Sequence, residues 1–182
     1  MTLTPLHLSG AYQLDLEKHG DKRGFFARYY CKDEFEEMGL VSTWIQMNIS
    51  VSHQKGTLRG LHFQRPPAAE TKVVRCLRGG IWDVIVDLRK GSNTFGKWVG
   101  VELNEENRSM IYVPKGFAHG FQTLTHNAEL LYMHSEPHRQ ECEGGVNLTD
   151  DTLAIQWPLE PTEVSERDLG LPNLPEVEPI QV

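Results

Sequence analysis

The sequence has 182 residues, which is enough for one domain with a well-developed core and cramped for two. Its formal net charge of −7 argues against a nucleic-acid binder or a membrane-surface binder. Three widely spaced cysteines, no stretch of membrane-spanning length and no signal-peptide pattern at the amino terminus together predict a cytoplasmic protein.

The predicted elements are mostly short strands. A helix of two turns is expected first, over residues 32–38, with Gly39 as its stop. The strands follow, bounded for the most part by Gly, Pro, Asn or Asp, over residues 44–51, 57–64, 72–77, 81–88, 98–103, 109–113, 120–125 and 129–134. A second helix is expected near residues 165–169, and the Pro- and Glu-rich residues 172–182 predict an extended tail. Strands at this spacing favour an antiparallel sandwich or barrel, and we expect a single all-β domain over residues 1–182.

The two central strands carry more detail. The turn Arg78-Gly79-Gly80 favours a hairpin that joins strand 72–77 to strand 81–88. Alternation in the second strand separates one face from the other. The first face carries Trp82, Val84, Val86 and Leu88, and the second carries Asp83 and Asp87 beside Ile81 and Ile85.

The run 57–64 offers the first candidate site. Arg59 and His62 are three positions apart, so on a regular strand their side chains would point to opposite faces. Gly60, between them, is the residue type that permits a bulge or bend. Such a bend could direct a titratable base and a fixed cation toward one cavity. An enzyme that removes a proton from an anionic substrate needs that pair of groups.

Three side chains suit this chemistry, and each has a structural alternative. His62 is the candidate general base, because imidazole titrates near neutral pH, although a histidine satisfied by hydrogen bonds is common. Lys72 is either a cation that stabilises an oxyanion or a lysine that extends to solvent. Tyr132 is either a proton donor or a core aromatic residue. An acidic partner for His62 cannot be chosen from the 25 acidic residues by spacing alone.

A metal site is the competing interpretation. The segment from Pro114 to His119 resembles the second half of the cupin signature, which often ends in a metal-binding histidine. The first half would need a His-x-His and a glutamate, but here Gln64 stands where the second histidine would be, with Glu70 further on. Because glutamine is a poor ligand for transition metals, we expect no metal, and a metal-dependent cupin isomerase or oxygenase remains the alternative.

Further motifs extend along most of the chain, from about Asp21 to Asp168. They are Asp21-Lys22-Arg23-Gly24-Phe25-Phe26, Gln46-Met47-Asn48, Leu58-Arg59-Gly60-Leu61-His62-Phe63-Gln64, Asp83-Val84-Ile85-Val86-Asp87-Leu88-Arg89, Thr94-Phe95-Gly96-Lys97-Trp98, Gly116-Phe117-Ala118-His119-Gly120-Phe121 and Trp157-Pro158. In this order they resemble the dTDP-4-dehydrorhamnose 3,5-epimerase family. The resemblance implies a cupin-type antiparallel jelly-roll barrel with a few short helices.

The resemblance also implies a reaction without cofactor or metal. A histidine matching His62 takes the proton from a carbon beside the C4 ketone of a nucleotide-linked 4-keto-6-deoxyhexose, and an aspartate matching Asp168 pairs with it. A lysine matching Lys72 stabilises the enolate, and a tyrosine matching Tyr132 returns a proton to the opposite face. Retention of all four argues against the rival of a non-catalytic cupin that only binds sugar nucleotides.

The family's substrate contacts map onto further positions. Arginines matching Arg23 and Arg59 hold the nucleotide diphosphate together with a histidine matching His119. Gln46 and Asn48 match polar positions on the substrate side. Phe26, Arg28, His138 and Glu143 complete the predicted substrate-binding set. The family is dimeric, with strands and substrate contacts shared between subunits, so we expect a homodimer.

Two departures from the family concern the nucleotide. Arg28 stands where the family usually has glutamate, and His138 stands where it usually has an aromatic residue. A carboxylate can accept the N3–H of thymine, whereas the donor-only arginine suits the N3 acceptor of cytosine. The nucleotide is therefore expected to be dTDP or CDP, unless Arg28 points to solvent or reaches a phosphate.

Overall fold

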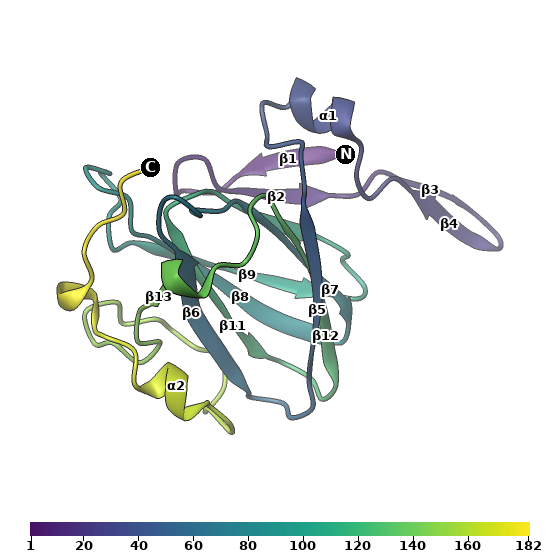
Figure 1. The fold of residues 1–182 in the computed structure, drawn as a ribbon. Coiled ribbons are helices and arrows are strands. Elements are labelled where there is room, and N and C mark those ends of the chain that lie inside the picture. Colours follow the sequence, from purple (N-terminus) through teal and green to yellow (C-terminus); the bar gives the residue numbers. More distant parts are fainter.

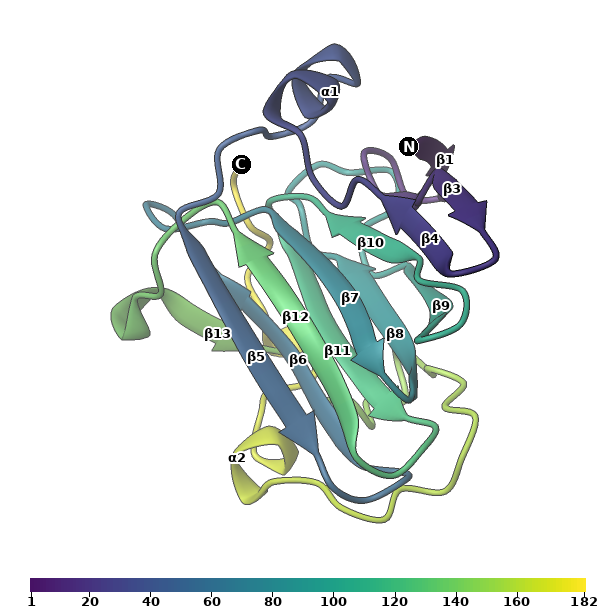
Figure 2. The same cartoon turned by 90° about the vertical axis from the view of Figure 1, so that its right-hand side faces the viewer.

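Strands with alternating or wholly apolar faces build two antiparallel sheets that pack face to face, and the computed structural model describes all of residues 1–182 (Figure 1). In spatial order, the first sheet contains β1 (Thr2–Pro5), β2 (Tyr12–Asp15), β10 (Met110–Val113), β7 (Lys72–Arg78), β12 (Ala128–His134) and β5 (Gln46–Ser52). The second contains β13 (Glu143–Gly145), β6 (Leu58–Gln64), β11 (Phe117–Thr123), β8 (Gly80–Asp87) and β9 (Trp98–Asn104). Figure 2 shows β5, β12 and β7 in front of β6, β11 and β8. The all-β prediction is confirmed.

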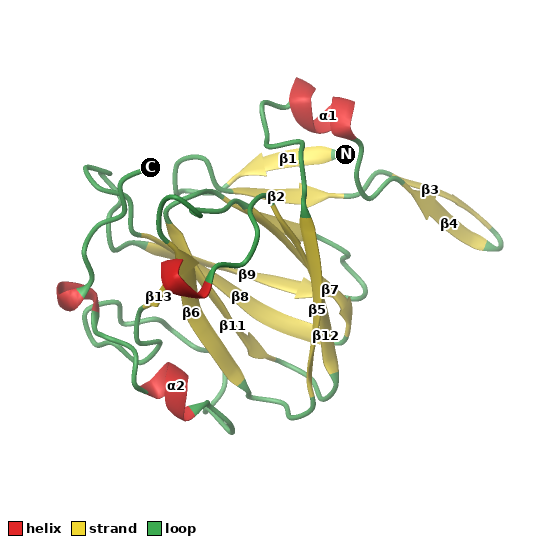
Figure 3. Ribbon diagram, viewed as in Figure 1, coloured by secondary structure: helices red, strands yellow, loops and turns green.

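Helix is scarce, as Figure 3 shows. The helix α1 (Lys32–Glu37) ends before Gly39, and α2 (Glu166–Leu169) begins after Ser165, whose side chain accepts a hydrogen bond from the amide of Asp168. Both helices lie where they were predicted. Neither has the length or the apolar composition needed to cross a bilayer.

The strand β8 is buried on both faces, with the residue division that its alternation predicts. Ile81 and Ile85 belong to the core between the two sheets. Val84, Val86 and Leu88 belong to a second core on the outer side of β8.

The predicted hairpin between residues 72–77 and 81–88 is wrong. The strand β7 pairs with β10 and β12, whereas β8 pairs with β9 and β11. The turn at Gly79 therefore carries the chain from one sheet to the other. The apolar side chains of the two strands, such as Val74 and Ile85, meet face to face in the core instead of lying side by side in one sheet.

The carboxyl-terminal segment, residues 172–182, whose composition predicted an extended tail, packs along the second sheet (Figure 1). Leu174, Val177 and Ile180 are buried against the outer face of β8. The backbone of Ile180 donates to the carbonyl of Leu88 at 2.7 Å and accepts from the amide of Lys90 at 2.8 Å. Burial of an apolar residue at every third position thus ties this segment to the fold.

One hairpin, formed by β3 (Lys18–Asp21) and β4 (Gly24–Ala27), projects away from both sheets (Figure 1). Its residues are exposed apart from the last one of β4. It was not among the predicted strands, and neither were β1, β2 and β13.

Candidate active site

A bulge in β6 determines where Arg59 and His62 point. His62 lies opposite His119 on β11, and Arg59 lies opposite Phe121. Three steps along β6 therefore match two steps along β11, which is the signature of one extra residue. Gly60 supplies the required backbone conformation, with φ +123°. Both side chains line one pocket, as the sequence predicts.

That pocket has a volume of about 400 Å³, and its lining comes from strands of both sheets and from α2. It brings together seven of the residues predicted for catalysis or substrate binding. They are Asn48, Arg59, His62, Lys72, His119, Tyr132 and Asp168.

His62 and Asp168 form a close pair. Nε2 of His62 lies 2.7 Å from Oδ1 of Asp168, and the amide of Gly60 donates to Oδ2 at 3.2 Å. Burial alone would raise the pKa of the Asp168 carboxyl, but these hydrogen bonds lower it below its ordinary value. An ionised carboxylate only accepts, so Nε2 carries the proton and Nδ1 is left with a free lone pair. The imidazole is thereby oriented as a base.

Lys72 is held by a carboxylate at the edge of the pocket. Its Nζ lies 3.0 Å from Oε1 of Glu70, and both side chains are nearly buried. Glu70 also contacts Nδ1 of His134, at 2.7 Å. Since an ammonium has three N–H donors and Glu70 takes one, two remain for an oxygen in the pocket.

Tyr132 lies on β12, in the other sheet from His62. Its hydroxyl group is 3.1 Å from the hydroxyl of Ser50. Burial raises the pKa of Tyr132, and the negative charge of Asp83 adds to the rise, whereas the hydrogen bond to Ser50 opposes it. The residue therefore stays a protonated phenol, the form that can donate a proton.

His119 is paired inside the core. Its Nε2 lies 2.8 Å from Oδ2 of Asp83, whose side chain is completely buried. Burial raises the pKa of Asp83, although His119 and Lys72 oppose the rise. The pair holds one edge of the His119 ring in the protein and leaves the rest at the pocket wall.

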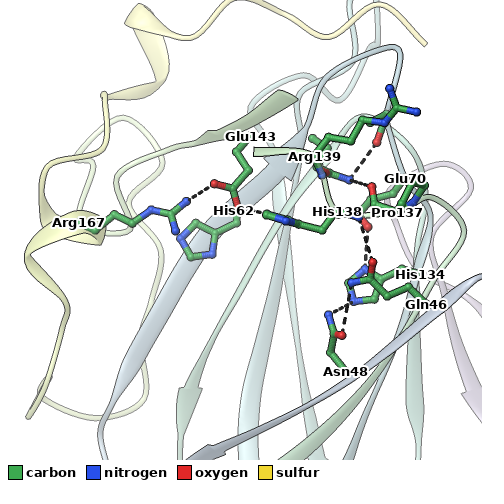
Figure 4. Close-up of polar contacts among 12 residues, drawn as sticks. Gln46, Asn48, His62, Glu70, His134, Pro137, His138, Arg139, Glu143 and Arg167 are labelled. Carbon is green, nitrogen blue, oxygen red and sulfur yellow. Dashed lines mark hydrogen bonds and ion pairs between the residues drawn. The ribbon is translucent and has the colours of Figure 1, made fainter. Parts of the chain in front are cut away.

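The rim of the pocket is formed by three further predicted residues, Gln46, His138 and Glu143. They do not line the pocket, but contact one another or lining residues (Figure 4). Oε1 of Gln46 accepts from the backbone amide of His138 at 3.0 Å. The ring of His138 is 2.8 Å from Glu143, which also pairs with Arg167 at 2.8 Å. Since Arg167 lines the pocket, this chain of contacts joins the rim to the cavity wall.

Three predicted substrate-binding residues do not reach the pocket of their own chain. Arg23 and Phe26 lie on the projecting hairpin, where Arg23 pairs with Asp21 and Phe26 is 75% exposed. Arg28 follows β4 and pairs with Glu34 of α1.

The sequence reasoning missed several lining or supporting residues. Ser50 could have been found, because it alternates with Gln46 and Asn48 along β5. Arg167, next to Asp168, could also have been found by position. His134 could have been found from its alternation with Tyr132 along β12, whereas its partner Glu70 carried no such signal, since the two residues are far apart along the chain.

The residues around the pocket do not resemble a metal centre. No group of three His, Cys, Asp or Glu side chains is arranged to hold an ion. Gln64, at the position of the missing second histidine, donates to the carbonyls of Ala68 and Pro137 and accepts from the amide of Arg139. The side chain of Gln64 therefore stabilises the backbone of neighbouring segments through hydrogen bonds.

Comparison with known proteins identifies the family to which the chain is similar. The model of the dTDP-4-dehydrorhamnose 3,5-epimerase family matches residues 5–176. The dTDP-4-dehydrorhamnose 3,5-epimerase of Salmonella typhimurium is 45% identical over 163 residues, 88% of each chain. The dTDP-4-dehydrorhamnose 3-epimerase of Streptomyces niveus is 39% identical, over 92% of this chain and 81% of its own.

The fold is similar to that of solved members. The crystal structure of dTDP-4-dehydrorhamnose 3,5-epimerase from Bacillus anthracis, with TDP and PPi bound, superposes with a TM-score of 0.91 at 41% identity. The match covers 94% of this chain and 98% of that one. The pocket geometry, the sequence identity and the jelly-roll fold thus agree, and the chain belongs to the dTDP-4-dehydrorhamnose 3,5-epimerase family of isomerases.

Proposed function

We propose that this protein inverts C3 and C5 of a dTDP-linked 4-keto-6-deoxyhexose through an enolate. The observation that carries the proposal is the 2.7 Å contact of His62 with Asp168 in a pocket that also contains Lys72 and Tyr132. The TDP found in the Bacillus anthracis relative supports the choice of nucleotide.

The first step is removal of a proton beside the ketone. Nδ1 of His62 takes the proton, and the C–H electron pair moves into the bond toward C4, which leaves negative charge on the C4 oxygen. The ammonium of Lys72 stabilises that oxygen. Asp168 stabilises the imidazolium that forms.

The second step returns a proton to the opposite face. Tyr132 donates its phenolic proton to the carbon, and the C4 carbonyl re-forms. His62 and Tyr132 belong to different sheets, so their side chains approach the pocket from opposed walls. Transfer of a proton from His62 to Tyr132 through solvent restores both groups, and no cofactor or metal takes part.

We also propose a homodimer with shared sites. The strand β5 is the free edge of its sheet, and Met47 and Val51 on this strand, together with Ile45 just before it, expose apolar side chains. A second copy of the chain would cover this apolar face and bring its projecting hairpin, with Arg23 and Phe26, and the adjacent Arg28 to the pocket. The three unpaired cysteines fit a cytoplasmic location.

Proton NMR in deuterated buffer tests the reaction. With dTDP-4-keto-6-deoxyglucose, we expect deuterium at C3 and at C5 and a new product; exchange at C3 alone would assign a 3-epimerase. A protein that only binds the sugar nucleotide would incorporate no deuterium. Loss of activity in chelator, restored by a metal, would favour the metal-dependent alternative.

The same assay decides the nucleotide. We expect faster turnover of the dTDP-linked substrate than of the CDP-linked one. Because Arg28 is paired with Glu34, its guanidinium is already engaged within the chain. A clear preference for the CDP-linked sugar would contradict the dTDP assignment and support recognition of cytosine by Arg28.

A further inference from the structure

Glu70 receives hydrogen bonds from two residues of the pocket, Lys72 and His134. The exposed fractions of the three side chains are 8%, 11% and 12%. Burial alone would raise the pKa of Glu70, but the hydrogen bond from His134 and the charge of Lys72 lower it below its ordinary value. Glu70 is therefore a carboxylate at neutral pH and can only accept hydrogen bonds.

The contacts continue from His134 to the rim (Figure 4). Nδ1 of His134 must donate to Glu70, and its Nε2 lies 3.4 Å from Nδ2 of Asn48, which is a donor. Nε2 therefore accepts, and the ring is the neutral Nδ1–H tautomer. Oδ1 of Asn48 accepts from Gln46 at 3.4 Å, and Gln46 accepts from the backbone amide of His138 at 3.0 Å.

In every hydrogen bond of this line of contacts, from His138 through Gln46, Asn48 and His134 to Glu70, the donor belongs to the residue further from Glu70. An imidazole and a side-chain amide can each be turned around, so they do not set the direction themselves. The two ends set it, because the carboxylate of Glu70 only accepts and the backbone amide of His138 only donates. Asn48 lines the pocket, so the direction of the line decides whether its N–H or its oxygen is available to a ligand.

We propose that Glu70 and His134 are positioning residues of this site. Glu70 holds the ammonium of Lys72 and, through the tautomer of His134, fixes the orientation of the Asn48 amide. The consequence for catalysis rests on the proposed epimerase reaction, whereas the tautomer does not depend on it.

The isosteric change Glu70→Gln tests the proposal. Because Lys72 only donates, the new amide oxygen must face Lys72 and the new NH₂ must face His134. His134 then has to accept at Nδ1 and carry its proton on Nε2. NMR of the imidazole nitrogens distinguishes the tautomers, and the signal of His134 is the one missing from His134→Asn.

We expect the Nδ1–H tautomer in the unmodified protein and the Nε2–H tautomer in Glu70→Gln. Any other pair of states overturns the proposal. Glu136→Gln is the matched control, since Glu136 pairs with Lys115 at 3.5 Å but does not line the pocket. This control should leave the His134 signal unchanged, and a tautomer change there would also overturn the proposal.

Kinetics supply the second measurement. With the dTDP-linked substrate, we expect Glu70→Gln to lower kcat about tenfold and to raise KM severalfold, because both Lys72 and Asn48 are disturbed. His134→Asn should lose less activity than His134→Leu, since its amide N–H can still reach Glu70. Equal losses overturn the proposal. An unmodified protein without epimerase activity would refute the proposed function and leave the tautomer result standing.

Discussion

Three histidines around the pocket each have a carboxylate partner, and their exposure separates their roles. The side chain of His62 is 38% exposed, whereas those of His119 and His134 are 6% and 12% exposed. Of the three histidines that line the pocket, only His62 therefore combines an oriented ring with a nitrogen that a substrate can approach readily; His138, which is paired with Glu143, does not line the pocket. A carboxylate partner alone does not identify the base; the accessible second nitrogen does.

Asp168→Asn tests this orientation at the level of one residue. The new amide can donate to Nε2 of His62, which moves the imidazole proton to Nδ1 and removes the basic lone pair. We expect kcat to fall by on the order of 10⁴-fold, as a wrong tautomer costs in a His–Asp pair. The measurement is turnover of the dTDP-linked substrate, with thermal unfolding to show that the variant is folded.

The exposed Asp151 provides the control for that substitution. Asp151→Asn makes the same chemical change away from the pocket and should retain full activity. A loss of less than tenfold in Asp168→Asn would contradict the role of Asp168 in setting the tautomer.

At the scale of strands and loops, the bulge in β6 depends on a close approach of two backbones. A Cβ atom added to Gly60 would lie 2.6 Å from Cα of Gly120 and 2.9 Å from the carbonyl oxygen of His119. No side-chain movement relieves such an overlap, because the contacting atoms belong to the neighbouring strand β11.

Gly60→Ala is therefore expected to destabilise the protein by at least ~2 kcal/mol and to abolish activity. Gly91→Ala is the matched control, since Gly91 also has a positive φ, +75°, but a Cβ atom there meets nothing within 4 Å. Urea denaturation compares the two. Equal losses of stability would show that backbone conformation, and not contact with β11, accounts for the effect.

The loop after β8 is closed by Asp87, which accepts from Arg89, Ser92 and Thr94. Burial alone would raise the pKa of Asp87, but these hydrogen bonds lower it from 3.8 to about 2. A lowered pKa in the folded state adds stability that is complete above pH 4 and is lost as the pH falls toward 2.

We therefore expect Asp87→Asn to be less stable by about 2 kcal/mol at pH 7. The difference should shrink between pH 4 and pH 2, as measured by urea denaturation at each pH. A difference that does not change with pH would contradict the ionised role of Asp87.

The elements also show what a sequence can predict. The strand β8 was predicted because it is a continuous apolar run beside a turn signal, and other strands were predicted because burial of one face leaves a two-residue period in the sequence. The exposed hairpin of β3 and β4 has no such period and was missed. Which strands pair with each other was harder to predict than the strands themselves, because Gly79 permits a sharp turn both within one sheet and between two sheets. The bulge at Gly60 was predicted because two chemically useful residues stood an odd number of positions apart.

In the pocket, too, residues with a local sequence signal were predicted, whereas contacts that depend on strand pairing were not. His62, Lys72 and Tyr132 were predicted together with Asp168, because their motifs resemble those of a family. His134 and Glu70 were not, since a contact between residues 64 positions apart depends on the pairing of β7 with β12.

On the scale of the whole molecule, the exposed face of β5 and the distance of the hairpin from its own pocket both favour association with a second copy. Met47 is 57% exposed on that face and does not line the pocket. Met47→Asp places a charge where an apolar contact is proposed.

We expect Met47→Asp to sediment as a monomer and to lose at least tenfold in activity, because each site would lack the hairpin of the other subunit. Val182→Asp, at an equally exposed apolar residue elsewhere on the surface, should remain a dimer. Sedimentation velocity makes the comparison. A dimeric Met47→Asp would exclude this face as the interface.

The two faces of β5 have different roles. Asn48 and Ser50 line the cavity, whereas Met47 and Val51 point outward. In the proposed dimer, ligand occupancy and self-association would be thermodynamically linked through this strand. By reciprocity, any factor by which pairing strengthens nucleotide affinity is also the factor by which the nucleotide strengthens pairing. Dilution would weaken both together, and saturating nucleotide would restore both.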